Sequence, residues 1–359
     1  KKFLSLMGAS MAMAGLVGCR KPVQKILPYI QAPEEIIPGI PNYYASTMQF
    51  GMNSFGIVVE THEGRPTHIE GNELHSSSKG ATNSFVQASI LDLYDPDRLK
   101  NPYNGEKEST IAHVRSFIRD ISKSFSSKGG KGLAVLSNSL RSTTTKDLYN
   151  RFNSKFPNSN WVAYDTDSQE NQILGIKNVA NKNLLPIYHF EKVDVILSID
   201  SDILGNDING IHNQKGFSKR RKVKNKSDRM NRLYCVESAL TTTGMMSDHR
   251  FKIKPTQVFS FIAELNNSLT SLGISKLKKI NQSKVDFKDE ISQKFIKALA
   301  EDLFKNKSHS LISVGAELNP SIHSLVYLIN EALLNNNKTI TYHTVNDAIL
   351  SDSDSLIKL

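Results

Sequence analysis

Apolar runs of strand length alternate with segments of helical periodicity from about residue 108 onward. The apolar runs predict β-strands over 133–136, 161–164, 193–199, 233–237, 311–314 and 339–342. The segments between them carry apolar residues at helical spacing and predict helices over 109–126, 141–156, 211–221, 257–271, 289–306 and 320–335. Strands that are apolar throughout and alternate with amphipathic helices indicate a parallel sheet covered by helices on both faces. The predicted fold class is therefore α/β, with an α/β body over 106–359.

A smaller, β-rich lobe is predicted over 46–105. Residues 56–70 alternate apolar and polar positions around the turn His62-Glu63-Gly64-Arg65, which indicates a β-hairpin. A short amphipathic helix is predicted at 86–94. The preceding stretch, 20–45, is rich in proline. Because proline fixes φ and cannot donate a backbone hydrogen bond, this stretch is predicted to be an extended tether.

Residues 1–19 have the pattern of an export signal. Lys1-Lys2-Phe3-Leu4 supplies a positive start and resembles the end of a twin-arginine signal, and the apolar stretch after it is too short to cross a bilayer as a helix. Leu16-Val17-Gly18-Cys19 is a lipobox, in which bacteria acylate the cysteine. Lipidation at Cys19 is therefore predicted, with two or three acyl chains anchoring the protein to a membrane. The alternative is a short buried helix that ends in a cysteine by chance.

The composition is that of a globular protein with a basic surplus. Of 359 residues, 39% are hydrophobic and 22% charged, and the net charge is +10. The densest basic run, 219–226, has no aromatic residues interleaved for base stacking, so we expect no nucleic-acid partner. The simplest interpretation of this run is a solvated face at the end of a helix.

Cysteine and histidine usage excludes the common metal centres. Cys19 and Cys235 are the only cysteines, too few for a cysteine-ligated cluster or a four-cysteine zinc site within the chain. Cys235 lies in an apolar run and is predicted to be a packed core thiol. The ten histidines show no H-E-x-x-H pattern. We therefore expect no metal ligands and no catalytic residues in this chain.

Ligands of parallel sheets bind beyond the carboxyl ends of the strands, which directs attention to the loops at 137–145, 200–210, 237–249 and 315–320. Ser137 and Asn138 follow one strand, and Asp200 and Asp202 follow another. Such residues suit a nucleotide or a cation, although ordinary turns and helix caps are the favoured interpretation. Neither loop is a G-x-G-x-x-G or a P-loop.

Three phrases carry a family resemblance: Glu63-Gly64-Arg65, Glu70-Gly71-Asn72 and the stretch Tyr94 to Pro102, read as Y-D-P-D-R-L-K-N-P. Their order and spacing resemble the start of molybdopterin oxidoreductases of the DMSO-reductase type. Thr241 to Pro255 resembles the pterin-nucleotide loop of that family. The resemblance implies a DMSO-reductase-like fold. It also implies vestigial pterin-site loops at Ser137, Asn138, Asp200, Asp202, Thr243 and Asp248.

The chain departs from this family where the family binds its cofactors. The four cysteines of the family's iron–sulfur site align with Met48, Gly51, Phe55 and Asn83. None of these is a thiolate, so that cluster cannot form. After Pro255 the family has Gly-Thr/Ser-Asp, whose acid meets the guanine, whereas this chain continues Thr256-Gln257-Val258. The resemblance therefore implies a degenerate relative without cluster or pterin.

One branch of the family combines these traits, the B subunits of bacterial alternative complex III. Further phrases resemble that branch: 3–10, 18–22, 33–39, 41–44, 204–210 and 243–250. In that branch the molybdopterin-like part has no cofactor, and a later ferredoxin-like part holds the iron–sulfur clusters. That part would lie beyond Leu359, so the chain is expected to be an N-terminal fragment. The complex oxidises membrane quinol and passes electrons to a cytochrome c or an oxidase.

The expected function is therefore a non-catalytic, cofactor-free portion of a respiratory quinol-oxidising complex. It would scaffold the iron–sulfur domain and a multihaem cytochrome c, anchored on the periplasmic side of the bacterial inner membrane. The main alternative is an active molybdopterin-dependent oxidoreductase that lacks the N-terminal cluster. A third possibility is a periplasmic substrate-binding lipoprotein.

Overall fold

The computed structural model describes residues 31, 33–50, 53–76, 78–281, 287–345 and 349–359. The predicted export signal over 1–19, Cys19 itself and most of the predicted tether lie outside these described residues. Within the described ranges, every helix is too short or too polar to cross a membrane.

The N-terminal lobe is a three-stranded antiparallel sheet in the order β1-β2-β3, formed by β1 (Asn42–Phe50), β2 (Asn53–His62) and β3 (Arg65–Gly71). It contains the predicted hairpin, whose turn residues Glu63 and Gly64 have φ of 54° and 79°. Two consecutive positive φ values match the twist of a tight hairpin. β1 begins at Asn42, so the last residues assigned to the tether are a strand paired with β2.

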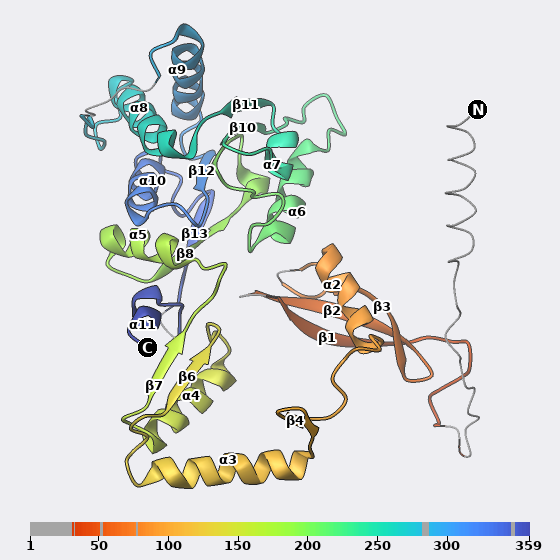
Figure 1. Ribbon diagram of the computed structural model, residues 1–359. Coiled ribbons are helices and arrows are strands. Elements are labelled where there is room, and N and C mark those ends of the chain that lie inside the picture. Colours follow the sequence, from red (N-terminus) through yellow and green to blue (C-terminus); the bar gives the residue numbers. More distant parts are fainter. Residues whose placement is uncertain (1–30, 32, 51–52, 77, 282–286, 346–348) are drawn as a thin grey trace, which may run out of the picture.

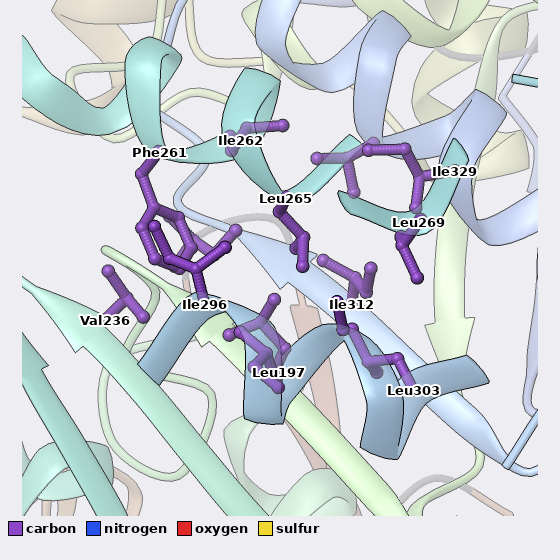
Figure 2. Packing of buried hydrophobic residues seen from close by; sticks show 14 of the residues in the cluster. Leu197, Val236, Phe261, Ile262, Leu265, Leu269, Ile296, Leu303, Ile312 and Ile329 are labelled. Atoms are coloured by element: carbon purple, nitrogen blue, oxygen red, sulfur yellow. The ribbon is translucent and has the colours of Figure 1, made fainter. Parts of the chain in front are cut away.

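The α/β body contains a four-stranded parallel sheet in the order β11-β10-β9-β12. Its strands are β9 (Val195–Ile199), β10 (Arg232–Glu237), β11 (His249–Lys252) and β12 (Ser310–Val314). On one face, residues such as Leu197 pack against α8 (Val258–Ser271), α9 (Glu290–Lys305) and α10 (Pro320–Ala332) (Figure 2). On the other face, Ile196 packs against Phe217 of α6 (Gly210–Arg221). Burial on both faces explains why these strands are apolar throughout, and it confirms the α/β class.

The remaining strands of the body lie outside this sheet and form separate pairs. β6 (Ala134–Ser137) and β7 (Asn160–Ala163) make a parallel pair of their own. The strand predicted at 339–342 exists as β13 (Ile340–Thr344), but it pairs antiparallel with β8 (Leu184–Tyr188). β8 was not predicted, since Pro186 interrupts its pattern.

Helix α5 (Glu170–Ala180) was also not predicted, and its position depends on one glycine. α5 packs against α10, where a Cβ atom on Gly175 would lie 2.3 Å from the Pro320 carbonyl oxygen and 2.5 Å from His323 Cβ. Only glycine lets the two helices approach this closely. The contact holds α5 against the start of α10, the helix that follows the carboxyl end of β12.

A thinner region is built from β6, β7, α3 (Ile111–Ser126) and α4 (Thr143–Lys155), and neither helix buries a residue. The short elements α2 (Ser84–Ala88), β4 (Tyr103–Asn104) and β5 (Lys107–Glu108) connect it to the N-terminal lobe (Figure 1). The last element, α11 (Ser353–Ile357), returns to β7, where the Asp352 N–H donates to the Ala163 carbonyl oxygen at 3.0 Å.

Candidate functional site

The carboxyl ends of β9, β10 and β12 bring three of the predicted loops together. Asp200 follows β9, and its Oδ1 accepts hydrogen bonds from Ser238 N (3.0 Å) and Ser238 Oγ (2.9 Å), beyond β10. The third loop abuts the first so closely that a Cβ atom on Gly315 would lie 2.1 Å from the Asp200 carbonyl oxygen. Asp200 itself has φ of 46°, a conformation that aspartate tolerates better than most residues.

Asp202 and Thr243, both predicted site residues, form a direct contact across this edge. Asp202 Oδ1 accepts from Thr243 N at 2.9 Å and from Thr243 Oγ1 at 2.8 Å, at the start of the short helix α7 (Thr242–Met245). Thr243 Oγ1 in turn accepts from Leu204 N at 3.0 Å. Thr243 is fully buried, so its hydroxyl is committed to this network. The two side chains therefore hold the loops after β9 and β10 together.

Glu237 is a third carboxylate at this edge, which the sequence analysis missed. It is the last residue of β10 and is only 1% exposed. Its carboxylate accepts from Thr241 Oγ1 at 2.7 Å and from Thr241 N at 3.3 Å. Arg250 Nε on β11 donates to Glu237 Oε1 at 2.5 Å. The sequence did offer a signal for this site, because Glu237 is a charged residue at the end of an apolar strand. A buried charge at such a position needs a partner.

Asp207 is a further carboxyl group at the same edge of the sheet. Burial raises its pKa to about 6, although hydrogen bonds from Asn209 N (2.7 Å) and Asn213 Nδ2 (3.2 Å) act in the opposite direction. The negative charge of Asp202 raises the pKa of Asp207 further. Burial also raises the pKa of Glu317 in the loop after β12, and the charge of Asp200 adds to that shift.

Ser137 and Asn138 lie elsewhere, at the end of β6 in the separate two-stranded sheet. Ser137 Oγ accepts from Trp161 Nε1 at 3.0 Å, and Asn138 Nδ2 donates to Asp165 Oδ1 at 3.3 Å. A hollow of about 390 Å³ lies nearby, and its walls include Ser139, Gln169 and Lys177.

Asp248 lies at the opposite, amino-terminal edge of the parallel sheet. Its carboxylate accepts from Arg221 Nη1 (2.8 Å), Arg221 Nη2 (2.5 Å) and Leu233 N (2.8 Å). Burial acts to raise its pKa, but the hydrogen bonds from Arg221 and Leu233 outweigh burial and lower it. The structure thus separates Asp248 from Thr243, although the two are close in sequence.

The positions that align with the family's cluster cysteines have structural roles. Met48 and Phe55 are cross-strand neighbours in β1 and β2, and Phe55 is part of the lobe's core. Asn83 Oδ1 caps α2 by accepting from Val86 N at 2.8 Å. Gly51 lies outside the described residues. No three His, Cys, Asp or Glu side chains in the described ranges are placed to hold a metal ion. Cys235 is a free, buried thiol, as predicted.

The described groups at the carboxyl edge do not fit a cofactor that carries phosphates. A phosphate binds where backbone N–H groups are free or cations converge. Here the Thr243 N–H is taken by Asp202, and the Thr241 N–H points at Glu237. The remaining side chains that follow β9 and β12 include further carboxylates, Asp200 and Glu317. Their charge would repel a phosphate rather than bind it.

Two comparisons with known proteins match the chain, although no family model does. The chain is 23% identical, over 301 residues, to the "Menaquinone reductase, molybdopterin-binding-like subunit" of Nitratidesulfovibrio vulgaris, covering 78% of this chain and 42% of that protein. The solved structure of acetylene hydratase from Pelobacter acetylenicus superimposes with a TM-score of 0.51 and 12% identity, over 82% of this chain and 43% of that one. The chain thus spans less than half the length of each. Its fold is the molybdopterin-oxidoreductase fold of the DMSO-reductase type that its motifs predict.

Proposed function

We propose that the chain is a cofactor-free part of a quinone-linked respiratory electron-transfer complex of the alternative complex III type. The sequence relative supports this, because its name describes a "molybdopterin-binding-like subunit" of a menaquinone reductase. The short phrases shared with the B subunits of alternative complex III support the finer assignment. In this role the chain orients an iron–sulfur domain and a multihaem cytochrome c and carries out no chemistry itself.

The observation that carries the proposal is that Asp202 and Glu237 accept hydrogen bonds from the backbone N–H groups at the start of α7. In an open site, the N–H groups at this position would face a ligand's anionic group. In this chain the two carboxylates stand in the place of that anion, and they also bond the hydroxyls of Thr241 and Thr243. To bind a pterin nucleotide here, the protein would have to break both contacts and bring a phosphate next to two carboxylates.

Membrane attachment completes the proposal. Acylation of Cys19, followed by the proline-rich stretch, would hold the folded body on the periplasmic side of the bacterial inner membrane. Iron–sulfur clusters would be held by a later part of the same polypeptide, as in the branch that the chain resembles. The subunit's contribution is then interface area and a fixed orientation between redox partners.

Metal and pterin analysis of the purified full-length protein tests the absence of cofactor. We expect molybdenum and tungsten far below one atom per chain and no pterin fluorescence after oxidative release. Stoichiometric molybdenum or tungsten together with released pterin would overturn the proposal. Copurification with c-type haem and haem reduction by added menaquinol test membership of the complex separately.

One observation favours the alternative of an active molybdopterin enzyme. The hollow of about 390 Å³ is lined by Ser139, the residue that follows Asn138, and by Gln169. The buried Oε1 of Gln169 has no hydrogen-bond partner in the described part of the chain. Such an atom could receive a donor from a ligand. The same metal and pterin analysis decides between the two functions.

A further inference from the structure

We propose that the loop over 222–230, together with the end of α6, forms a docking hollow for a carboxylate-rich segment of a partner protein. The proposal rests on the proposed function in one respect, because it requires partner subunits. The loop joins α6 to β10 (Figure 1). It therefore precedes the amino end of β10, whereas the acidic residues follow the carboxyl ends of the strands.

The hollow has a volume of about 640 Å³ and is lined mainly by cations. Its positive side chains are Lys219, Arg220, Lys222, Lys224 and Arg229. Two carboxylates, Asp194 and Asp228, also line it. Cations therefore exceed carboxylates by three in the wall, and an incoming anion would meet a net positive surface.

Both carboxylates of the wall are already engaged. Asp194 forms an ion pair with Arg220. Asp228 Oδ2 accepts from the backbone N–H groups of Lys224 (2.8 Å) and Asn225 (2.9 Å), and these two bonds lower the pKa of Asp228. Asp228 thus stabilises a turn in the loop, in which the lysine side chains are exposed.

The cations divide into a structural set and a free set. Arg221 binds Asp248 and lies over the ring of Phe217, 4.8 Å from its centroid, so it stabilises the fold. Cations in the last turn of α6 also complement the helix dipole. Neither an ion pair within the fold nor the helix dipole accounts for Lys222, Lys224 and Arg229. These three side chains lie beyond the helix, are exposed, and form no ion pair with any described residue.

The shape and composition of the hollow favour an acidic protein segment. Base stacking requires aromatic side chains, and none lines the hollow. A membrane presents a broad surface, whereas a concave wall encloses a protruding segment. Val223 and Met230 lie near the two ends of the loop and are 54% and 52% exposed. Methionine and arginine are enriched in protein interfaces, where apolar contacts shield charged pairs from water.

The test uses a fluorescein-labelled peptide of six glutamates as the probe and the purified full-length protein. One variant carries K219Q, K222Q, K224Q and R229Q. A control variant carries K128Q, K131Q, K276Q and K279Q, which removes the same charge from exposed sites elsewhere. We expect the wild type and the control to bind the peptide with an affinity that falls as salt rises. The loop variant should bind about tenfold more weakly, with a flatter salt dependence.

Equal binding by both variants would overturn the proposal, provided that their thermal unfolding matches the wild type. If the wild type does not bind the peptide but sediments with phosphatidylglycerol vesicles, the proposal is overturned in favour of a lipid surface. Failure of the proposed function would be seen in a different measurement, as molybdenum and pterin in the purified protein. That result would not change the peptide-binding comparison between the variants.

Discussion

The carboxylate of Glu237 fills the space beside Gly244, where a Cβ atom would lie 1.9 Å from Glu237 Oε1. Both residues are buried, and Glu237 is held by Thr241 and Arg250, so the carboxylate cannot move aside without losing hydrogen bonds. The position of the carboxylate therefore requires glycine at residue 244, and the two residues pack together at the carboxyl end of β10.

Gly244→Ala should destabilise the protein by about 3 kcal/mol, because the added methyl group displaces a buried, hydrogen-bonded carboxylate. Urea denaturation monitored by circular dichroism measures the change. Thr242→Ala is a matched control on the same helix, since Thr242 is exposed, and it should change the free energy of unfolding by less than about 0.5 kcal/mol. Equal effects of the two substitutions would show that Glu237 has room to move.

Arg250→Ala should also destabilise the fold, since it leaves Glu237 as a buried carboxylate without its cation. The side chains of Arg250 and Glu237 are 31% and 1% exposed, so solvent can replace part of the lost interaction. We expect a loss of about 2 kcal/mol, below the range for a fully buried pair. Arg151→Ala removes an exposed pair with Asp147 and should change stability by less than about 0.5 kcal/mol. A loss of the same size in both variants would contradict the expected role of Glu237.

The alternation of apolar strands with amphipathic helices was enough to predict most elements of the body. It predicted β9, β10 and β12 and the helices α8, α9 and α10, because burial on both faces of a sheet leaves a clear apolar pattern. It failed at α5 and β8. Gly175 and Pro186 weaken the local pattern there, and contacts with α10 and β13 determine the structure instead.

The candidate site was predicted in part, for a related reason. Residues directly after strands, such as Asp200 and Asp202, were assigned to the correct edge, because parallel strands end together. Asp248 was grouped with Thr243 because both belong to the stretch 241–255 that resembles the family's pterin-nucleotide loop, but the chain crosses the sheet between them, so they lie at opposite edges. Glu237 was missed because the charged residue at the end of an apolar strand was treated as the solvent-exposed end of the strand, although it is buried.

Asp207→Asn should stabilise the protein at neutral pH. The pKa of Asp207 is raised to about 6 in the folded state, above the ordinary value of 3.8, so the folded protein binds its proton more tightly than the unfolded chain. The stabilising effect of that proton is complete below about pH 4 and is lost as the pH rises through 6.

The amide that replaces the carboxylate in this variant keeps an acceptor for the Asn209 N–H without the charge. Because Asp207 is only partly buried, we expect a gain of about 1 kcal/mol at pH 8 that shrinks toward zero near pH 4. Thermal unfolding at several pH values measures it. Asp147→Asn, at an exposed position on α4, is the control and should show no such pH dependence. A gain that does not change with pH would mean that Asp207 is not the titrating group.

His323 should make the fold sensitive to acid. It is 3% exposed at the contact between α10 and α5, and burial lowers its pKa from the ordinary 6.5 to about 4, although hydrogen bonds with the backbone of Ala316 and Leu318 oppose that shift. The unfolded chain therefore binds the proton more readily than the folded protein. Its neutral form contributes stability above pH 6.5, and this contribution is lost as the pH falls toward 4.

His323 alone should cost the wild type about 3 kcal/mol of stability between pH 7 and pH 4. His323→Gln removes the titrating ring, so its stability should change less over the same interval, even if the substitution lowers stability at pH 7. His68→Gln is the matched control, because His68 is an exposed residue of the N-terminal lobe and should leave the acid dependence unchanged. Urea denaturation at pH 7, 5.5 and 4 distinguishes them. If the two variants lose stability in parallel with the wild type, the acid sensitivity arises from groups other than His323, and the packing of α5 on α10 does not depend on a neutral imidazole.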